Sequence, residues 1–109
     1  MFDTISIIGC GLIGSSILRA IKNKNIAKEI KVFDNSKEVT AYLKKENICE
    51  NASNDIRQCV ANSDLIIIAT PLSSYKEIIL SIKDILKKNV ILTDTGSVKK
   101  RGYENNSQY

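Results

Sequence analysis

Short apolar runs alternate along the chain with longer segments in which apolar residues recur at helical spacing. The short runs are rich in β-branched residues and predict five strands, at residues 4–8, 30–33, 49–53, 65–69 and 90–93. The longer segments predict four helices: one that begins near Ile13, one capped by Asn35 or Ser36, one at 55–61 and one at 75–88. Strands and helices therefore follow one another in regular alternation.

This alternation predicts an α/β fold of the Rossmann type, a doubly wound parallel sheet of about five strands with helices on both faces. The run at 65–69 has no polar alternation, as is typical of parallel strands covered on both faces. A chain of 109 residues can bury one core, which is too little for a cofactor domain plus a substrate domain. We expect one domain over residues 1–100 and, because residues 101–109 are polar and lack periodicity, a disordered or unrelated tail after it.

Residues 9–14 read Gly-Cys-Gly-Leu-Ile-Gly and match G-x-G-x-x-G between a predicted strand and a predicted helix. In that context Gly9 allows a tight turn, Gly11 lets the backbone approach a pyrophosphate, and Gly14 lets helix and strand pack closely. The start of the helix adds free N–H groups and the positive end of the helix dipole, and both favour phosphate. The motif predicts a dinucleotide site with these cofactor-binding candidates: Gly9, Gly11, Leu12, Ile13 and Gly14.

An acidic residue stands at the second position that such a site requires. Asp34 closes the second predicted strand 20 residues after Gly14, and a carboxylate there accepts hydrogen bonds from the adenosine ribose hydroxyls. This favours NAD over NADP as the cofactor. The neighbouring Asn35 is a further candidate cofactor-binding residue. The alternative is a plain glycine turn followed by an aspartate that caps the next helix.

Two further loops follow strands that end at the same edge of a parallel sheet, where ligands bind in such folds. Thr70 and Pro71 are predicted to lie beside the nicotinamide half of the cofactor, Thr70 with a hydroxyl and Pro71 with a rigid backbone. The polar segment 94–97 is where a substrate would approach. Plain loops that end the strands are the alternative reading of both segments.

Composition and charge narrow the choice of partners. A content of 43% apolar and 26% charged residues is typical of a globular domain, and a net charge of +4, half of it within residues 99–104, is weak evidence for nucleic acid. The chain has no apolar run of the roughly 20 residues that a membrane helix needs and no basic start of a signal peptide, so we expect a cytoplasmic protein.

The chain has three cysteines, Cys10, Cys49 and Cys59. Because their number is odd and they lack C-x-x-C spacing, we expect reduced thiols and no metal site.

The sequence offers little for acid–base catalysis. It contains no histidine, the side chain best suited to moving a proton near neutral pH. Lys99 and Asp94 are the remaining candidate bases, and a solvated charge is the alternative for Lys99. Cys10 begins a helix, where a thiol becomes more acidic, but a small turn residue explains it as well.

Several of these segments together resemble the nucleotide-binding domain of prephenate and arogenate dehydrogenases of tyrosine biosynthesis. The resemblance runs from about residue 4 to Lys100, and rests on Gly-Leu-Ile-Gly-Ser-Ser at 11–16, on Asp34, on Ala-Thr-Pro at 69–71 and on Asp-Thr-Gly-Ser-Val-Lys at 94–99. It implies binding of NAD or NADP and oxidative decarboxylation of prephenate to 4-hydroxyphenylpyruvate, or of arogenate to tyrosine. It also implies a catalytic role for Ser97, which helps to hold the catalytic histidine and the substrate hydroxyl.

The sequence also departs from the family pattern. Ser15 replaces a further glycine found in many members. After Lys100 the family continues with a Gly-Gly-His-Pro segment that carries the catalytic histidine, and then with a helical domain through which members form homodimers and bind substrate. The resemblance therefore implies a cofactor domain cut before the helical dimerisation domain, and we expect it to be inactive as an isolated fragment.

Three other functions fit parts of the sequence. The chain could be the cofactor domain of another NAD(P)-dependent enzyme, such as a pyrroline-carboxylate reductase or a hydroxy-acid dehydrogenase. It could be a non-catalytic NAD-binding relic or module, with cofactor affinity and no turnover. Nucleic-acid binding through residues 99–101 is a weaker alternative that predicts a steep salt dependence.

Overall fold

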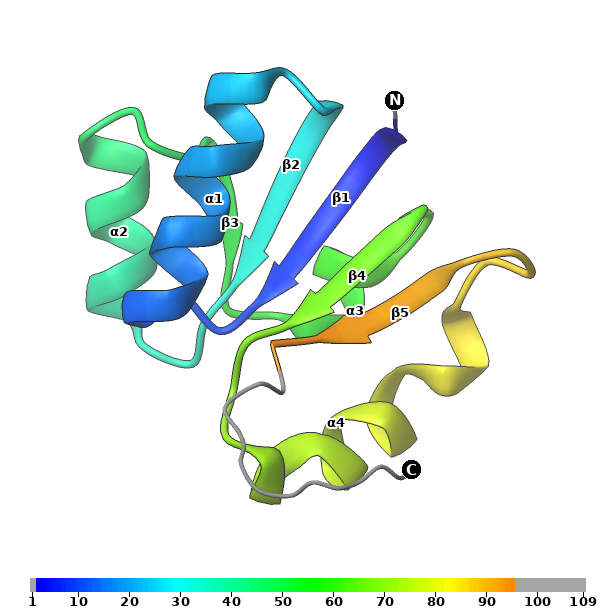
Figure 1. Cartoon of the computed structure of the whole chain (residues 1–109). Coiled ribbons are helices and arrows are strands. Elements are labelled where there is room, and N and C mark those ends of the chain that lie inside the picture. Colours follow the sequence, from blue (N-terminus) through cyan, green and yellow to red (C-terminus); the bar gives the residue numbers. More distant parts are fainter. Residues whose placement is uncertain (1, 96–109) are drawn as a thin grey trace.

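The computed structural model describes residues 2–95 and contains a five-stranded sheet within them (Figure 1). Its strands are β1 (Phe2–Ile8), β2 (Ala27–Phe33), β3 (Asn51–Ser53), β4 (Leu65–Ile68) and β5 (Ile91–Asp94). The α-helices are α1 (Leu12–Lys24), α2 (Lys37–Lys45), α3 (Ile56–Val60) and α4 (Tyr75–Ile82), and the 3-10 helices are η1 (Leu72–Ser74) and η2 (Lys83–Ile85). The predicted alternation of strands and helices is confirmed.

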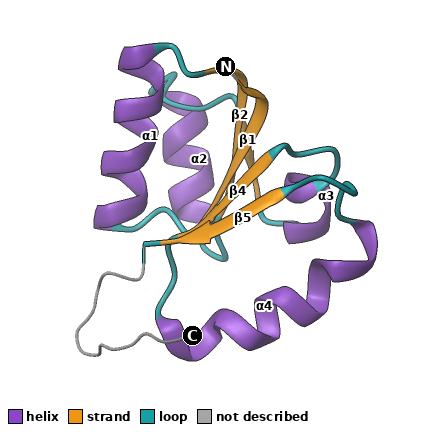
Figure 2. Cartoon of the chain, turned by 45° about the vertical axis from the view of Figure 1, so that its right-hand side comes forward, coloured by secondary structure: helices purple, strands orange, loops and turns teal. Residues whose placement is uncertain are grey.

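All neighbouring strands pair in parallel, in the order β3-β2-β1-β4-β5. Helices α1 and α2 cover one face of the sheet, and α3 and α4 cover the other (Figure 2). The chain therefore winds outward from β1 in both directions, and the strand order reverses between β1 and β4. This is the Rossmann arrangement predicted from the sequence, in which ligands bind beyond the carboxyl ends of the strands at the reversal point.

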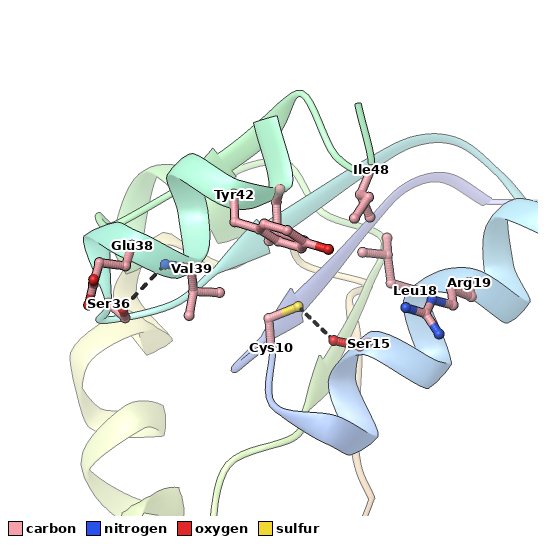
Figure 3. Close-up of a pocket in the computed structure, with 10 residues that line it drawn as sticks. Cys10, Ser15, Leu18, Arg19, Ser36, Glu38, Val39, Tyr42 and Ile48 are labelled. Carbon is pink, nitrogen blue, oxygen red and sulfur yellow. Dashed lines mark hydrogen bonds between the residues drawn. The ribbon is translucent and has the colours of Figure 1, made fainter. Parts of the chain in front are cut away.

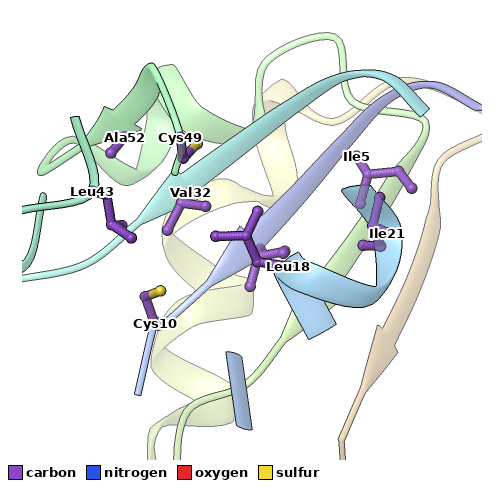
Figure 4. Packing of buried hydrophobic residues seen from close by; sticks show 9 residues of the cluster. Ile5, Cys10, Leu18, Ile21, Val32, Leu43, Cys49 and Ala52 are labelled. Carbon is purple, nitrogen blue, oxygen red and sulfur yellow. The ribbon is translucent and has the colours of Figure 1, made fainter. Parts of the chain in front are cut away.

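Buried residues on β1 alternate between two hydrophobic clusters. Ile5 and Ile7 belong to the cluster that includes Leu18 of α1 and Leu43 of α2 (Figure 4). Ile8 belongs to the other cluster, which Val60 of α3, Ile66 and Ile68 of β4 and Ile82 of α4 complete. Because β1 is covered on both faces, its carboxyl end is held rigidly where the glycine motif begins.

Two polar side chains secure the sheet away from that end. The buried Ser6 hydroxyl donates to the Cys59 carbonyl at 2.7 Å, which satisfies it inside the core. At the amino edge, the Asp64 carboxylate pairs with Lys87 and accepts the Asp3 and Thr4 N–H groups at 3.1 and 3.0 Å. The bond from Lys87, with those amides, lowers the pKa of Asp64 below its ordinary value. The carboxylate thereby ties the start of β1 to the loop before β4.

The last predicted helix is shorter in the structure than its apolar pattern suggests. The α-helical part ends at Ile82 rather than at residue 88, and η2 follows. The Arg57 guanidinium on α3 donates to the Ser81 carbonyl at 2.9 Å and to both oxygens of Asp84 at 2.9 Å. These contacts hold the end of α4 and η2 against α3, while the partly buried Ile85 still packs against the core, so the apolar spacing continues beyond the end of the helix.

No helix in the described part of the chain is long and apolar enough to cross a membrane. The predicted tail at 101–109 lies outside the described residues.

Candidate functional site

The parallel register brings the carboxyl ends of the five strands to one edge of the sheet. Ile8 of β1 lies opposite Phe33 of β2 and Ile68 of β4, so the segments after these three strands begin at the same level. Ser53 of β3 and Asp94 of β5 end level with them. Residues 9–14, 34–36 and 70–71 are therefore assembled at the reversal point between β1 and β4.

Two glycines of the motif are required by close backbone packing. Gly9 has φ of +93°, and its N–H donates to the Phe33 carbonyl at 2.7 Å. A Cβ on Gly9 would lie 2.8 Å from Cγ2 of Thr70, and a Cβ on Gly14 would lie 2.2 Å from the carbonyl oxygen of Gly9. Strand β1, helix α1 and the end of β4 thus approach more closely here than side chains would permit.

Gly11 differs, because a Cβ there would meet nothing within 4 Å. Gly11 is the N-cap of α1, supplies no side-chain oxygen to the helix, and is followed by a first turn without acidic residues. The first amides of α1 are consequently left open to an external acceptor at the positive end of a 13-residue helix. Beside them Leu12 is 88% and Ile13 45% exposed. The arrangement can accept an anionic group such as a pyrophosphate.

Asp34 connects the glycine motif to its neighbours. Its Oδ2 accepts the Cys10 N–H and its Oδ1 accepts the Ser36 N–H, both at 2.9 Å. The Ser36 hydroxyl accepts the Val39 N–H, so Ser36 rather than Asn35 caps α2. Asn35 is exposed between the two.

Sequence reasoning missed Asn54. Its side-chain amide donates to the Asp34 carbonyl at 2.8 Å. Its Oδ1 lies 3.4 Å from the Thr40 hydroxyl of α2. The available signal was positional, since Asn54 directly follows β3 and strand ends meet at this edge. Asn54 therefore belongs to the shell that supports Asp34.

The end of β4 contributes a polar group without a partner. Thr70 Oγ1 is buried and has no hydrogen-bond partner within the described region. A buried hydroxyl left unpaired typically costs about 1–3 kcal/mol, so a ligand atom that bonded it would be favoured. Pro71 follows, exposed, and leads into η1. Thr70 therefore offers an unused hydrogen-bonding group beside Gly9.

A cavity of about 430 Å³ opens between α1 and α2 next to this site (Figure 3). Ser15, Leu18 and Arg19 of α1 face Tyr42 of α2 across it. The Cys10 thiol lies on its floor, 3.5 Å from the Ser15 hydroxyl. Cys10 thus bonds Asp34 through its backbone amide, while its side chain lines the cavity and packs in the cluster with Leu18 and Leu43.

The other reactive candidates are two buried cysteines and the polar residues from Asp94 onward. Burial raises the pKa of Cys49, and raises that of Cys59 to about 12, so both remain protonated thiols. No group of three or more potential metal ligands occurs among residues 2–95. Asp94 ends β5 beside β4, whereas Ser97 and Lys99 lie outside the described residues.

Comparison with known proteins identifies the family. Residues 17–109 match the family described as prephenate dehydrogenase, nucleotide-binding domain. The chain belongs to this family. A cyclohexadienyl dehydrogenase of Zymomonas mobilis is 36% identical over 99 residues, which are 91% of this chain and 34% of that protein. A prephenate dehydrogenase of Bacillus subtilis is 30% identical over 105 residues, 93% of this chain and 28% of that protein.

Solved structures agree with this assignment at the level of the fold. A prephenate dehydrogenase of A. aeolicus, in complex with hydroxyphenyl propionate and NAD+, superposes with a TM-score of 0.79 at 20% identity over 89% of this chain and 34% of that chain. The arogenate dehydrogenase of Synechocystis gives a TM-score of 0.75 at 18% identity over 84% and 32%. The chain spans about a third of the length of these family members and carries their nucleotide-binding domain.

Proposed function

We propose that this domain binds NAD across the carboxyl edge of its sheet, as the cofactor-binding part of a prephenate or arogenate dehydrogenase. The observation that carries the proposal is the open space at Gly11, where the start of α1 has no side-chain cap hydrogen bond, next to Cys10, whose N–H bonds the Asp34 carboxylate. The residues fit the cofactor, because the open amides suit a pyrophosphate and the carboxylate suits ribose hydroxyls. Bound NAD would supply the hydride acceptor.

Each residue would have a separate task. Gly11 and the amides at the start of α1 would hold the pyrophosphate, with Gly9 and Gly14 bringing the strand and helix close enough. Asp34 would accept hydrogen bonds from the adenosine ribose, with Asn35 beside it. On the other side of the reversal point, Thr70 and Pro71 would lie at the nicotinamide half, where the free Thr70 hydroxyl can bond the cofactor. Leu12 and Ile13, both exposed, would border the pyrophosphate at the start of α1.

We further propose that the whole protein oxidatively decarboxylates prephenate to 4-hydroxyphenylpyruvate, or arogenate to tyrosine. The family match and the named activities of the relatives support this, and Ser97 would help to hold the catalytic histidine and the substrate hydroxyl. Homodimerisation would involve the part of the family's length that these 109 residues do not span. Three free cysteines support a reducing, cytoplasmic setting, and we propose a small-molecule substrate with neither nucleic acid nor membrane as partner.

Substitution of Asp34 by alanine is expected to narrow a preference for NAD over NADP. The unaltered carboxylate would repel a 2′-phosphate and bond a 2′-hydroxyl. Loss of a hydrogen bond to a charged group costs about 1.5–3 kcal/mol, so NAD should bind about 10 to 100 times more weakly. Calorimetric titration of both nucleotides measures the change. Equal affinity of the unaltered chain for NAD and NADP would refute the assignment of Asp34.

The 109-residue chain by itself is expected to give no measurable turnover of prephenate or arogenate. It contains no histidine, and a well-placed general base typically contributes about 10² to 10⁴-fold in rate. Addition of a C-terminal fragment of a relative should restore NADH formation, and Ser97→Ala should lower the restored rate. Absorbance of NADH follows both reactions. Turnover by the chain alone, abolished by Ser97→Ala, would contradict the expectation that catalysis needs residues outside this chain.

A further inference from the structure

Both carboxylate oxygens of Asp34 are already engaged by backbone amides from two different loops. The Cys10 N–H comes from the glycine motif and the Ser36 N–H from the cap of α2, each at 2.9 Å. A side chain that only recognised a ribose would not need either bond. Asp34 therefore links its own loop, which leads into α2, to the glycine motif across the proposed nucleotide site.

The bond to Cys10 acts on the phosphate-binding segment itself. The Gly9 N–H donates to the Phe33 carbonyl and the Cys10 N–H to the Asp34 carboxylate, so consecutive motif amides are anchored to consecutive residues at the end of β2. Gly11 comes next and opens α1. The position of the open amides of α1 relative to β2 is consequently set at Asp34.

Asp34 is itself held from the side of β3. Its N–H donates to the Ser53 carbonyl at 3.2 Å, and its carbonyl accepts the Asn54 side-chain amide at 2.8 Å. Since both backbone groups and both carboxylate oxygens of Asp34 have partners, the residue is immobilised before any ligand arrives. A support fixed in this way can hold the glycine motif in place.

We propose that Asp34 is a positioning residue for the phosphate-binding amides of α1, in addition to its role toward the ribose. The inference rests on the proposed binding of NAD. It requires phosphate binding to depend on Asp34 even when the ligand has no ribose hydroxyls. If Asp34 acted only on the ribose, its loss should not weaken the binding of a ligand without ribose hydroxyls. Removing a negative charge near a phosphate should then leave anion binding unchanged or strengthen it.

The test compares ADP with 2′,3′-dideoxy-ADP, titrated calorimetrically into the unaltered chain, Asp34→Asn and Asp55→Asn. Asparagine keeps the size of the side chain but can accept only one of the two amide bonds. We expect Asp34→Asn to weaken dideoxy-ADP binding about 2- to 10-fold, the effect of one hydrogen bond, and ADP binding by more. Asp55, which caps α3 without contacting the glycine motif, is the matched control, and Asp55→Asn should leave both affinities unchanged.

Amide hydrogen exchange separates local positioning from loss of folding. In Asp34→Asn, exchange should quicken at Cys10 and Ser36 while interior amides of β1 keep their rates. In the unaltered chain, the Cys10 amide should exchange at least about tenfold more slowly than the Leu12 amide. This comparison needs no variant. Equal exchange of these two amides would overturn the proposal, even if Asp34→Asn fails to fold.

Each binding outcome also has a defined meaning. Dideoxy-ADP affinity that is unchanged or higher in a folded Asp34→Asn overturns the positioning role and leaves the proposed function intact. Failure of the unaltered chain to bind NAD, ADP and dideoxy-ADP refutes the proposed function, and the positioning role with it.

Discussion

Replacement of Gly14 by alanine is expected to destabilise the domain by about 2 kcal/mol or more. The added Cβ would lie 2.2 Å from the Gly9 carbonyl oxygen and 3.1 Å from its carbonyl carbon. These are backbone atoms of a residue with positive φ whose N–H is bonded to Phe33, so they cannot move aside cheaply. Overpacking typically costs about 1–3 kcal/mol and more against rigid groups, which outweighs the gain of about 1 kcal/mol in helix propensity from glycine to alanine.

The loss is measurable as a lower midpoint of urea unfolding with an unchanged slope. Gly11→Ala is the matched control, because it makes the same chemical change in the same motif where a Cβ meets nothing within 4 Å. It should leave stability within about 1 kcal/mol of the unaltered chain. Similar midpoints for Gly14→Ala and the unaltered chain would mean that strand and helix do not approach as closely as described.

The fold was largely predictable because its signals are local. Uninterrupted apolar runs mark strands covered on both faces, helical spacing marks the segments between them, and the motif at 9–14 separates the first pair. The alternation then leaves few topologies, since parallel crossovers are nearly always right-handed. The end of α4 was not predicted, because a contact distant in the sequence sets it. Arg57 of α3 binds the Ser81 carbonyl, and no local pattern reveals a contact 24 residues away.

The sequence predicted the residues of the candidate site but not the hydrogen bonds that connect them. The distance of 20 residues from Gly14 identifies Asp34 as the acidic residue of the motif. Its bond to the Ser36 amide is local, two residues along the chain, but its bond to the Cys10 amide depends on the tertiary approach of two loops, as does the contact from Asn54. Backbone donors carry no side-chain signature, so a sequence shows which carboxylate is available but not which amides already occupy it.

Substitution of Gly11 by valine is expected to abolish NAD binding while the domain remains folded. The backbone of Gly11 is extended, with φ of −80°, so this position does not need the left-handed conformation that favours glycine. Its Cβ would point into space that no described atom occupies within 4 Å. The valine side chain should therefore leave the stability of the fold nearly unchanged. The circular dichroism spectrum and the unfolding midpoint of the variant should stay close to those of the unaltered chain.

The effect on the cofactor follows from the same open space. If the pyrophosphate lies against Gly11, the methyl groups of valine displace it from the amides at the start of α1. Loss of two hydrogen bonds to a charged group, at about 1.5–3 kcal/mol each, weakens binding more than 100-fold. Gly11→Ala, which adds a single methyl group, should give an intermediate loss in the same calorimetric titration. A folded Gly11→Val that keeps the affinity of the unaltered chain for NAD would mean that the glycine motif is only a turn and that the nucleotide binds elsewhere.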